Sequence, residues 1–208
     1  MNQIKVLVIT RYQMLGESLK SLLELDDNIY LIDRCNDDEN CLEYIDRMKP
    51  DVVVYCIVKE ITSLLYRVIK HSSKIILLSN LIDHISIKKS MVLGADGYII
   101  LNSEFSILQK AIYAVVNQDE NLQKSLPCIF NNSKWLNKNK LYSKREYQIL
   151  ELISIGIDNK EIAELFSISE VTVRIHISNL LKKTNCSCRN QLIIYGIKHS
   201  NVISNSIY

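Results

Sequence analysis

The chain has 208 residues, of which 48% are hydrophobic and 23% charged, and its formal net charge is +2. This length fits two modest domains, and the composition is ordinary for a globular protein. No apolar run is long enough to span a membrane, and strand-like residues begin near the N-terminus in place of a signal peptide. We therefore expect a cytoplasmic protein whose six cysteines are reduced.

The first half of the chain alternates between two kinds of pattern. Short apolar runs at 4–9, 29–32, 52–57, 75–78 and 98–100 are typical of strands covered on both faces. Helical patterns lie between and after them, at 14–24, 40–48, 62–70, 85–93 and 104–116. Five such strand–helix units predict a doubly wound α/β domain with a parallel sheet, whose functional edge lies at the carboxyl ends of the strands.

The composition changes after this domain. Residues 117–140 are polar and weakly periodic, and Pro127 is expected to interrupt any helix there. We predict a first domain at 1–120, a linker at 121–138 that contains Trp135, and a second domain at 139–208. Residues 1–116 carry a net charge of −2 and residues 117–208 a net charge of +4, so the second half is the more suitable for nucleic acid, although the excess is small.

Three short helices are predicted between residues 141 and 191. Ser143 with Glu146 and Asp158 with Glu161 have the spacing of capping boxes, and Ser169 is a third N-cap. Gly156 is placed to end the first helix. The short connection between the second and third helices predicts a helix-turn-helix at about 159–178.

The third of these helices has two distinct faces. Val173, Ile177, Leu180 and Thr184 form a narrow stripe that we expect to face the core. The opposite face combines β-branched apolar residues with polar ones, which suits thymine methyl groups, base edges and phosphates of double-stranded DNA. The alternative is a helix that packs into a bundle with its apolar residues buried. The predicted DNA-binding residues are Lys160, Val171, Thr172, Arg174, Ile175, Ser178, Asn179 and Lys182.

This segment resembles the LuxR-type (GerE) DNA-binding domain over about 139–203. The resemblance implies four helices, with the third reading DNA and the fourth, from Arg189 to about His199, often forming a dimer. We therefore expect a homodimer, through this helix, the first domain or both. The residues that carry the resemblance are Leu141, Arg145, Glu146, Gly156, Asn159-Lys160-Glu161-Ile162-Ala163, Ile168-Ser169, Thr172-Val173-Arg174, His176, Lys183 and Arg189.

Two short sequences in the first domain stand out: Lys49-Pro50-Asp51-Val52-Val53 before the third strand and Gly94-Ala95-Asp96-Gly97-Tyr98 at the fifth. With the order and lengths of its elements, they make the first domain similar to the receiver domain of response regulators, so the whole chain resembles the NarL/FixJ type. At the positions where a receiver holds its phosphorylation pocket, however, the chain has Thr10, Arg11, Cys56, Ser79 and Leu101. Only the hydroxyl of Ser79 fits, because a receiver needs carboxylates for Mg²⁺ and an aspartate as phosphoryl acceptor.

We therefore predict a transcriptional regulator with a degenerate receiver that is not phosphorylated at the usual site. We expect no catalytic residue, metal or cofactor, and no enzyme motif such as G-x-G-x-x-G follows the first strand. Alternatives stay open at this point. Cys56 is either a redox switch or a small buried thiol. Arg11 either points into solvent, imitates a permanently neutralised or locked pocket, or binds an effector protein or acidic ligand. The chain could also act as an antagonist that forms a heterodimer with a true response regulator.

Overall fold

The computed structural model describes residues 3–36, 38, 40–57, 63–71, 74–80, 84–130 and 141–199, except for the side chains of Ile32, His84 and Ile129. The chain divides into two compact units, at 1–131 and 132–208. None of the helices within the described ranges is both long and apolar enough to cross a membrane.

The first unit is built on a parallel sheet, as predicted. The strands lie in the order β2-β1-β3-β4-β5, and every residue of β3 and β4 is buried. Such full burial is expected of strands that are covered by helices on both faces. The strands are β1 (Ile4–Ile9), β2 (Ile29–Cys35), β3 (Val52–Ile57), β4 (Ile75–Ser79) and β5 (Gly97–Ile100).

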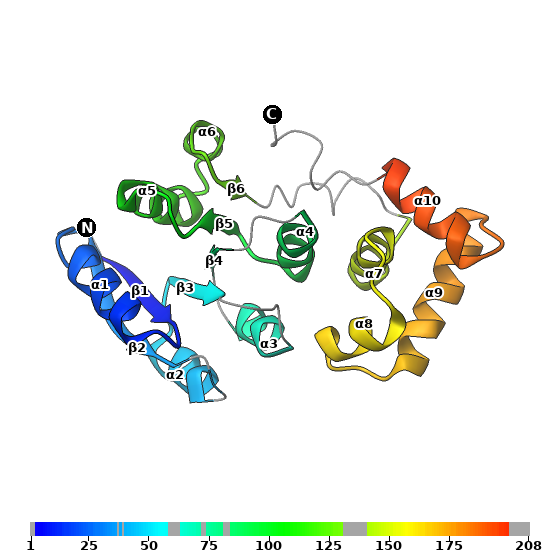
Figure 1. Cartoon of the computed structure of the whole chain (residues 1–208), viewed down its shortest axis with the longest axis horizontal. Helices are drawn as coiled ribbons and strands as arrows, with labels where there is room; N and C mark the ends of the chain where they lie inside the picture. Colours follow the sequence, from blue (N-terminus) through cyan, green and yellow to red (C-terminus); the bar gives the residue numbers. More distant parts are fainter. Residues whose placement is uncertain are drawn as a thin grey trace. The chain divides into compact units, whose positions relative to one another are not determined.

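Helices cover both faces of this sheet (Figure 1). α1 (Gln13–Leu23) and α5 (Phe105–Val116) lie on one face, where Leu23 and Ile112 are fully buried in the core. α2 (Asn40–Met48), α3 (Ser63–His71) and α4 (His84–Leu93) lie on the other. The predicted helices are confirmed to within a residue or two, although Thr62, the first residue of one of them, lies outside the described residues.

The structure corrects the linker that was predicted from residue 121. A short helix, α6 (Glu120–Ser125), begins at an N-cap formed by Asp119, whose side chain accepts hydrogen bonds from the backbone amides of Asn121 and Leu122. A two-residue strand, β6 (Ile129–Phe130), then pairs antiparallel with β5. The chain as far as residue 130 therefore belongs to the first unit. The rest of the predicted linker, including Trp135, lies outside the described residues.

Over residues 141–199 the second unit forms four helices, in agreement with the sequence-based expectation. They are α7 (Lys144–Ser154), α8 (Asn159–Phe166), α9 (Glu170–Thr184) and α10 (Arg189–His199). Each contributes to one core, in which Leu152, Ile162, Val173 and Leu192 have no exposed surface. Gly156 follows α7 with a φ of +88°, a conformation that favours glycine and ends the helix.

Candidate nucleic-acid interface

The turn between α8 and α9 is held by backbone and cap hydrogen bonds. Ser167 ends α8 in the left-handed conformation, with a φ of +52°. The amide of Ile168 donates to the carbonyl oxygen of Ala163 at 3.0 Å. Ser169 then caps α9, because its hydroxyl accepts from the amide of Thr172 at 3.1 Å. These contacts fix the geometry of a helix-turn-helix.

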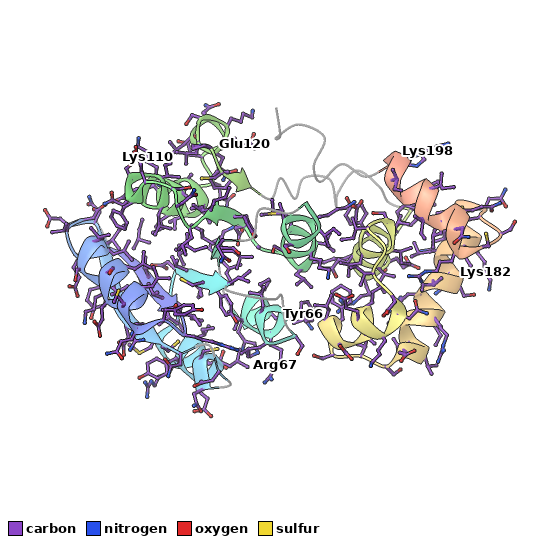
Figure 2. The ribbon with its side chains drawn as sticks, viewed as in Figure 1. Tyr66, Arg67, Lys110, Glu120, Lys182 and Lys198 are labelled. Atoms are coloured by element: carbon purple, nitrogen blue, oxygen red, sulfur yellow. The ribbon has the colours of Figure 1, made fainter. Side chains whose placement is uncertain are left out.

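The two faces of α9 are separated as predicted. Val173, Ile177 and Leu180 are buried against the other helices, whereas Val171 and Ile175 are 58% and 56% exposed. The alternative of a bundle helix with both of these side chains buried is therefore wrong. Of the polar residues predicted on this face, Arg174, Ser178, Asn179 and Lys182 are exposed, and Figure 2 shows Lys182 pointing away from the domain.

Two other predicted contact residues lie at helix starts. Thr172 is only half-exposed, and its hydroxyl lies 2.9 Å from that of Ser169, so it is part of the α9 cap. Lys160 is exposed in the first turn of α8, next to the N-cap Asp158. An exposed lysine beside a helix N-terminus is well suited to contact a phosphate.

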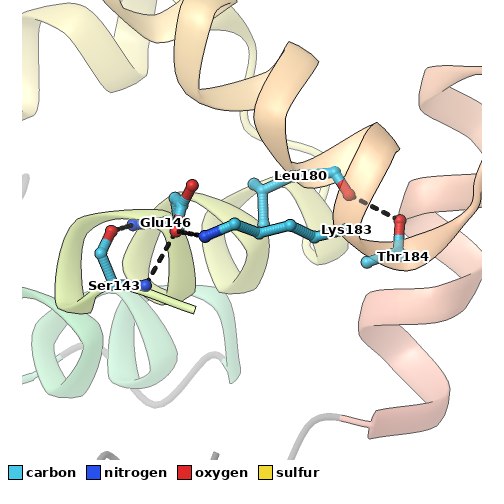
Figure 3. Close-up of polar contacts among 5 residues, drawn as sticks. All are labelled: Ser143, Glu146, Leu180, Lys183 and Thr184. Atoms are coloured by element: carbon cyan, nitrogen blue, oxygen red, sulfur yellow. Dashed lines mark hydrogen bonds and ion pairs between the residues drawn. The ribbon is translucent and has the colours of Figure 1, made fainter. Parts of the chain in front are cut away.

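A buried carboxylate joins α9 to α7 (Figure 3). Glu146 Oε2 accepts a hydrogen bond from Lys183 Nζ at 2.7 Å and from the amide of Ser143 at 2.8 Å, and the Ser143 hydroxyl accepts from the amide of Glu146. Burial opposes ionisation, but the hydrogen bonds from Lys183 and Ser143 outweigh it, so the pKa of Glu146 is lowered from its ordinary value of 4.5. The predicted capping box is confirmed, and it also anchors the last turn of α9.

A second polar contact joins α10 to the start of α8. Arg189 donates from Nη1 to Asn159 Oδ1 at 2.8 Å and from Nη2 to the carbonyl oxygen of Ile157 at 2.6 Å. Sequence reasoning identified Lys183 and Arg189 only as marks of a family resemblance. Their partners are 37 and about 30 residues away, so no local pattern could have revealed these roles.

In the first unit, the pocket positions named from the sequence lie together at the carboxyl edge of the sheet. Register pairs Ile9 with Tyr55, which places the following residues, Thr10 and Cys56, next to each other. Ile57 pairs with Ser79, and the amide of Leu101 donates to the Ser79 carbonyl at 2.8 Å.

The side chains at this edge differ in their exposure. Thr10, Cys56 and Ser79 are buried, whereas Arg11 and Leu101 are exposed. Within the described ranges, no three His, Cys, Asp or Glu side chains are grouped closely enough to hold a metal ion.

The thiols of this chain lie in different surroundings. Cys56 is 3% exposed and belongs to the apolar core of the sheet, which hinders access of an oxidant. Burial, together with the nearby Cys41, raises the pKa of Cys35 to about 12, so that thiol is a poor nucleophile. Cys186 lies in the second unit, just after α9. It is only half-buried, with Sγ 3.8 Å from the carbonyl oxygen of Thr184.

Comparison with known proteins agrees with both units. The model of the luxR family of bacterial regulatory proteins matches residues 140–196. The transcriptional regulatory protein DegU of Brevibacillus brevis is 26% identical, covering 95% of this chain and 94% of DegU. LiaR of Bacillus subtilis, also a transcriptional regulatory protein, is 29% identical, covering 97% of this chain and all of LiaR.

Solved structures show the same folds at lower identity. The signal receiver domain of NarL from Mycobacterium tuberculosis covers 56% of this chain and 98% of its own length, with a TM-score of 0.52 and 17% identity. RcsB from Salmonella enterica serovar Typhimurium, solved bound to a promoter, covers 95% of this chain and all of its own length, with a TM-score of 0.51 and 16% identity. Residues 140–196 therefore match the luxR family of bacterial regulatory proteins, and the two units have the folds seen in the RcsB structure, the first of them also that of the NarL receiver domain.

Proposed function

We propose that this chain is a sequence-specific DNA-binding transcriptional regulator whose α9 enters the major groove. The observation that carries the proposal is the open outward face of α9, which presents hydroxyl, amide, cationic and apolar side chains together. A helix of a helix-turn-helix that keeps such a face free is suited to reading base edges. The family match over 140–196 and the two relatives that are transcriptional regulatory proteins support the same function.

The residues on this face are proposed to have two kinds of role. Ser178 and Asn179 lie on the exposed face and Arg174 lies at its side, and all three would contact base edges. Lys160 at the start of α8 and Lys182 near the end of α9 would contact phosphates and set the orientation of the domain.

An affinity series tests these roles. Duplexes selected by the full chain from a random pool would be titrated in a gel shift against the parent, Arg174→Ala, Lys182→Ala and Lys160→Ala. We expect Arg174→Ala to cost roughly 1–3 kcal/mol on selected sequences and less on unrelated DNA. Lys160→Ala and Lys182→Ala should weaken binding to all duplexes and reduce the dependence of affinity on salt.

Lys110→Ala is the matched control, since Lys110 is an exposed lysine on α5 of the first unit (Figure 2). Affinities equal to that of the parent for all three of the other variants would contradict the proposed interface.

The receiver-like unit is proposed to work without phosphorylation at the usual site. The residue at the phosphoryl-acceptor position is Cys56, which cannot form an acyl phosphate. Thr10 and Arg11 stand where a receiver has the two carboxylates that bind Mg²⁺. Control would then come from an effector protein or small ligand that binds this unit, or the regulator would be constitutively competent.

A homodimer is proposed through α10. Ile194 and Ile197 on this helix are 53% and 59% exposed, one turn apart. Dimers that place two reading helices on successive half-sites are the usual arrangement for this motif. Ile197→Glu should shift the sedimentation of the full chain towards the monomer, whereas Lys198→Glu changes charge on the same helix without removing apolar surface. A dimer that is unaffected by Ile197→Glu would rule out this surface.

A further inference from the structure

Two apolar side chains on the outward face of α9 are unexplained by contacts to phosphates or polar base edges. Val171 and Ile175 are 58% and 56% exposed and lie one helical turn apart, so they occupy the same side of the helix. The residues around them are polar: Arg174 and Ser178 are both exposed. An apolar side chain contributes favourable free energy only when its surface is removed from water. The position of these two side chains therefore indicates a partner with apolar groups at matching places.

We propose that Val171 and Ile175 together read the C5 methyl groups of two thymines in the major groove. This inference rests on the proposed function, and it names the bases that α9 selects. The thymine methyl is the apolar group that a base pair presents in the major groove, and it distinguishes thymine from the other three bases there. A pair of such contacts would give α9 a preference for T·A pairs at two defined positions.

The spacing of the pair restricts where these thymines lie. Four residues of α-helix advance by about 6 Å, and successive bases of one strand are about 3.4 Å apart along the duplex axis. With α9 lying along the groove, Val171 and Ile175 would therefore meet methyl groups about two base steps apart. A single thymine, or two thymines far apart in the site, would not fit this geometry.

The pair is also held rigidly, which a selective apolar contact requires. Valine and isoleucine in a helix strongly prefer one χ1 rotamer, so little side-chain freedom is lost on binding. The Ser169 hydroxyl binds both the amide and the hydroxyl of Thr172, which fixes the turn that carries Val171. On the opposite side of α9, Val173 and Ile177 are packed in the core.

Replacement of thymine by deoxyuridine tests the proposal directly. Uracil keeps the O4 acceptor and the pairing of thymine and lacks only the methyl group. In duplexes selected by the full chain from a random pool, each thymine would be replaced in turn and the affinity measured. We expect about a threefold to tenfold loss at two positions roughly two base pairs apart, from the area of one methyl group at each, and no comparable loss elsewhere.

Variants of the two residues assign the positions. Val171→Ala should bind thymine and uracil equally at one of the two positions, and Ile175→Ala should do so at the other. Val171→Thr keeps the branched shape but replaces one methyl group by a hydroxyl, so it should discriminate less strongly than the parent. Both side chains are exposed, so the fold should be retained, and circular dichroism would check this. Lys160→Ala is the control, because it should weaken binding to thymine and uracil duplexes by the same factor.

The outcomes separate this inference from the proposed function. If the parent binds its selected duplex and uracil at every position leaves the affinity unchanged, the methyl contacts are refuted while DNA binding stands. Discrimination that survives in Val171→Ala and Ile175→Ala would overturn the assignment to these residues. Failure to select or bind any duplex would overturn both proposals together.

Discussion

Glu146 shows how a single residue can support an interface that it does not touch. The residue is 5% exposed, and its carboxylate ties α7 to the last turn of α9 through Lys183. Because its pKa is lowered in the folded chain, the ionised form stabilises the fold at any pH above the ordinary value of 4.5. That stabilisation is lost as the pH falls from this value through the lowered pKa.

Glu146→Gln should therefore destabilise the second unit in a pH-dependent way. We expect a loss of about 1–2 kcal/mol near pH 7, a modest value because Lys183 is partly exposed to water. The difference from the parent should shrink as the pH falls below about 4.5, because the unfolded parent then takes up a proton at Glu146 that the folded parent does not yet bind. Amide hydrogen exchange of α7, corrected for intrinsic rates, measures this unit separately from the other. Glu164→Gln, an exposed change on α8, is the control, and a difference that stays constant from pH 7 to pH 3.5 would contradict the argument.

These residues also show which roles of single side chains could be predicted from the sequence. The cap of Ser143 and Glu146 and the two faces of α9 follow from spacings of three or four residues, which a helix determines. The partnership of Glu146 with Lys183 depends on how two helices cross. The role of Thr172 as part of a cap was missed for a related reason, since its position on the helix does not reveal which way its hydroxyl turns.

Between elements, α10 packs against α7 at a glycine. A Cβ added at Gly196 would lie 2.8 Å from the Cβ of Ser154 and 3.3 Å from the carbonyl oxygen of Leu150. These neighbours are a side-chain stem and a backbone atom, so α10 would have to move away from α7. The helix that is proposed to form the dimer is thus held close to the domain by the absence of a side chain.

Gly196→Ala is expected to lower the free energy of unfolding by about 1–3 kcal/mol through overpacking, reduced in part by the better helix propensity of alanine. Urea unfolding followed by exchange of α10 and α7 would measure it. Ser154→Gly removes the nearest atom, so the double variant should be less destabilised than the sum of the single changes. Additive effects would mean that the contact with Ser154 is not the cause.

At this scale the sequence predicted five strands and nine of the helices but missed α6 and β6. Those two elements have six and two residues, too few for a periodic pattern to be visible. The strand β6 exists because β5 offers backbone partners to it, which is information about the rest of the sheet and not about residues 129 and 130 themselves.

For the whole molecule, the proposed loss of the phosphorylation pocket leads to a simple expectation. Incubation with acetyl phosphate and Mg²⁺ should leave the intact mass of the chain and its affinity for selected DNA unchanged, if Cys56 stands at the acceptor position as proposed. A relative with the acceptor aspartate, treated in parallel, is the positive control. A stoichiometric gain of one phosphoryl group would refute phosphorylation independence.

The short strand β6 has a practical consequence for how this protein can be divided. It pairs with Gly97 and Tyr98 and so covers the side of β5 that would otherwise end the sheet. In a fragment that stopped at residue 120, those backbone groups of β5 would be unpaired. They could then form hydrogen bonds with strands of other molecules, which promotes aggregation. A fragment that ends after Phe130 keeps β6 paired with these two residues of β5. The position of the cut, more than the stability of the core, should therefore decide whether the isolated first unit stays in solution.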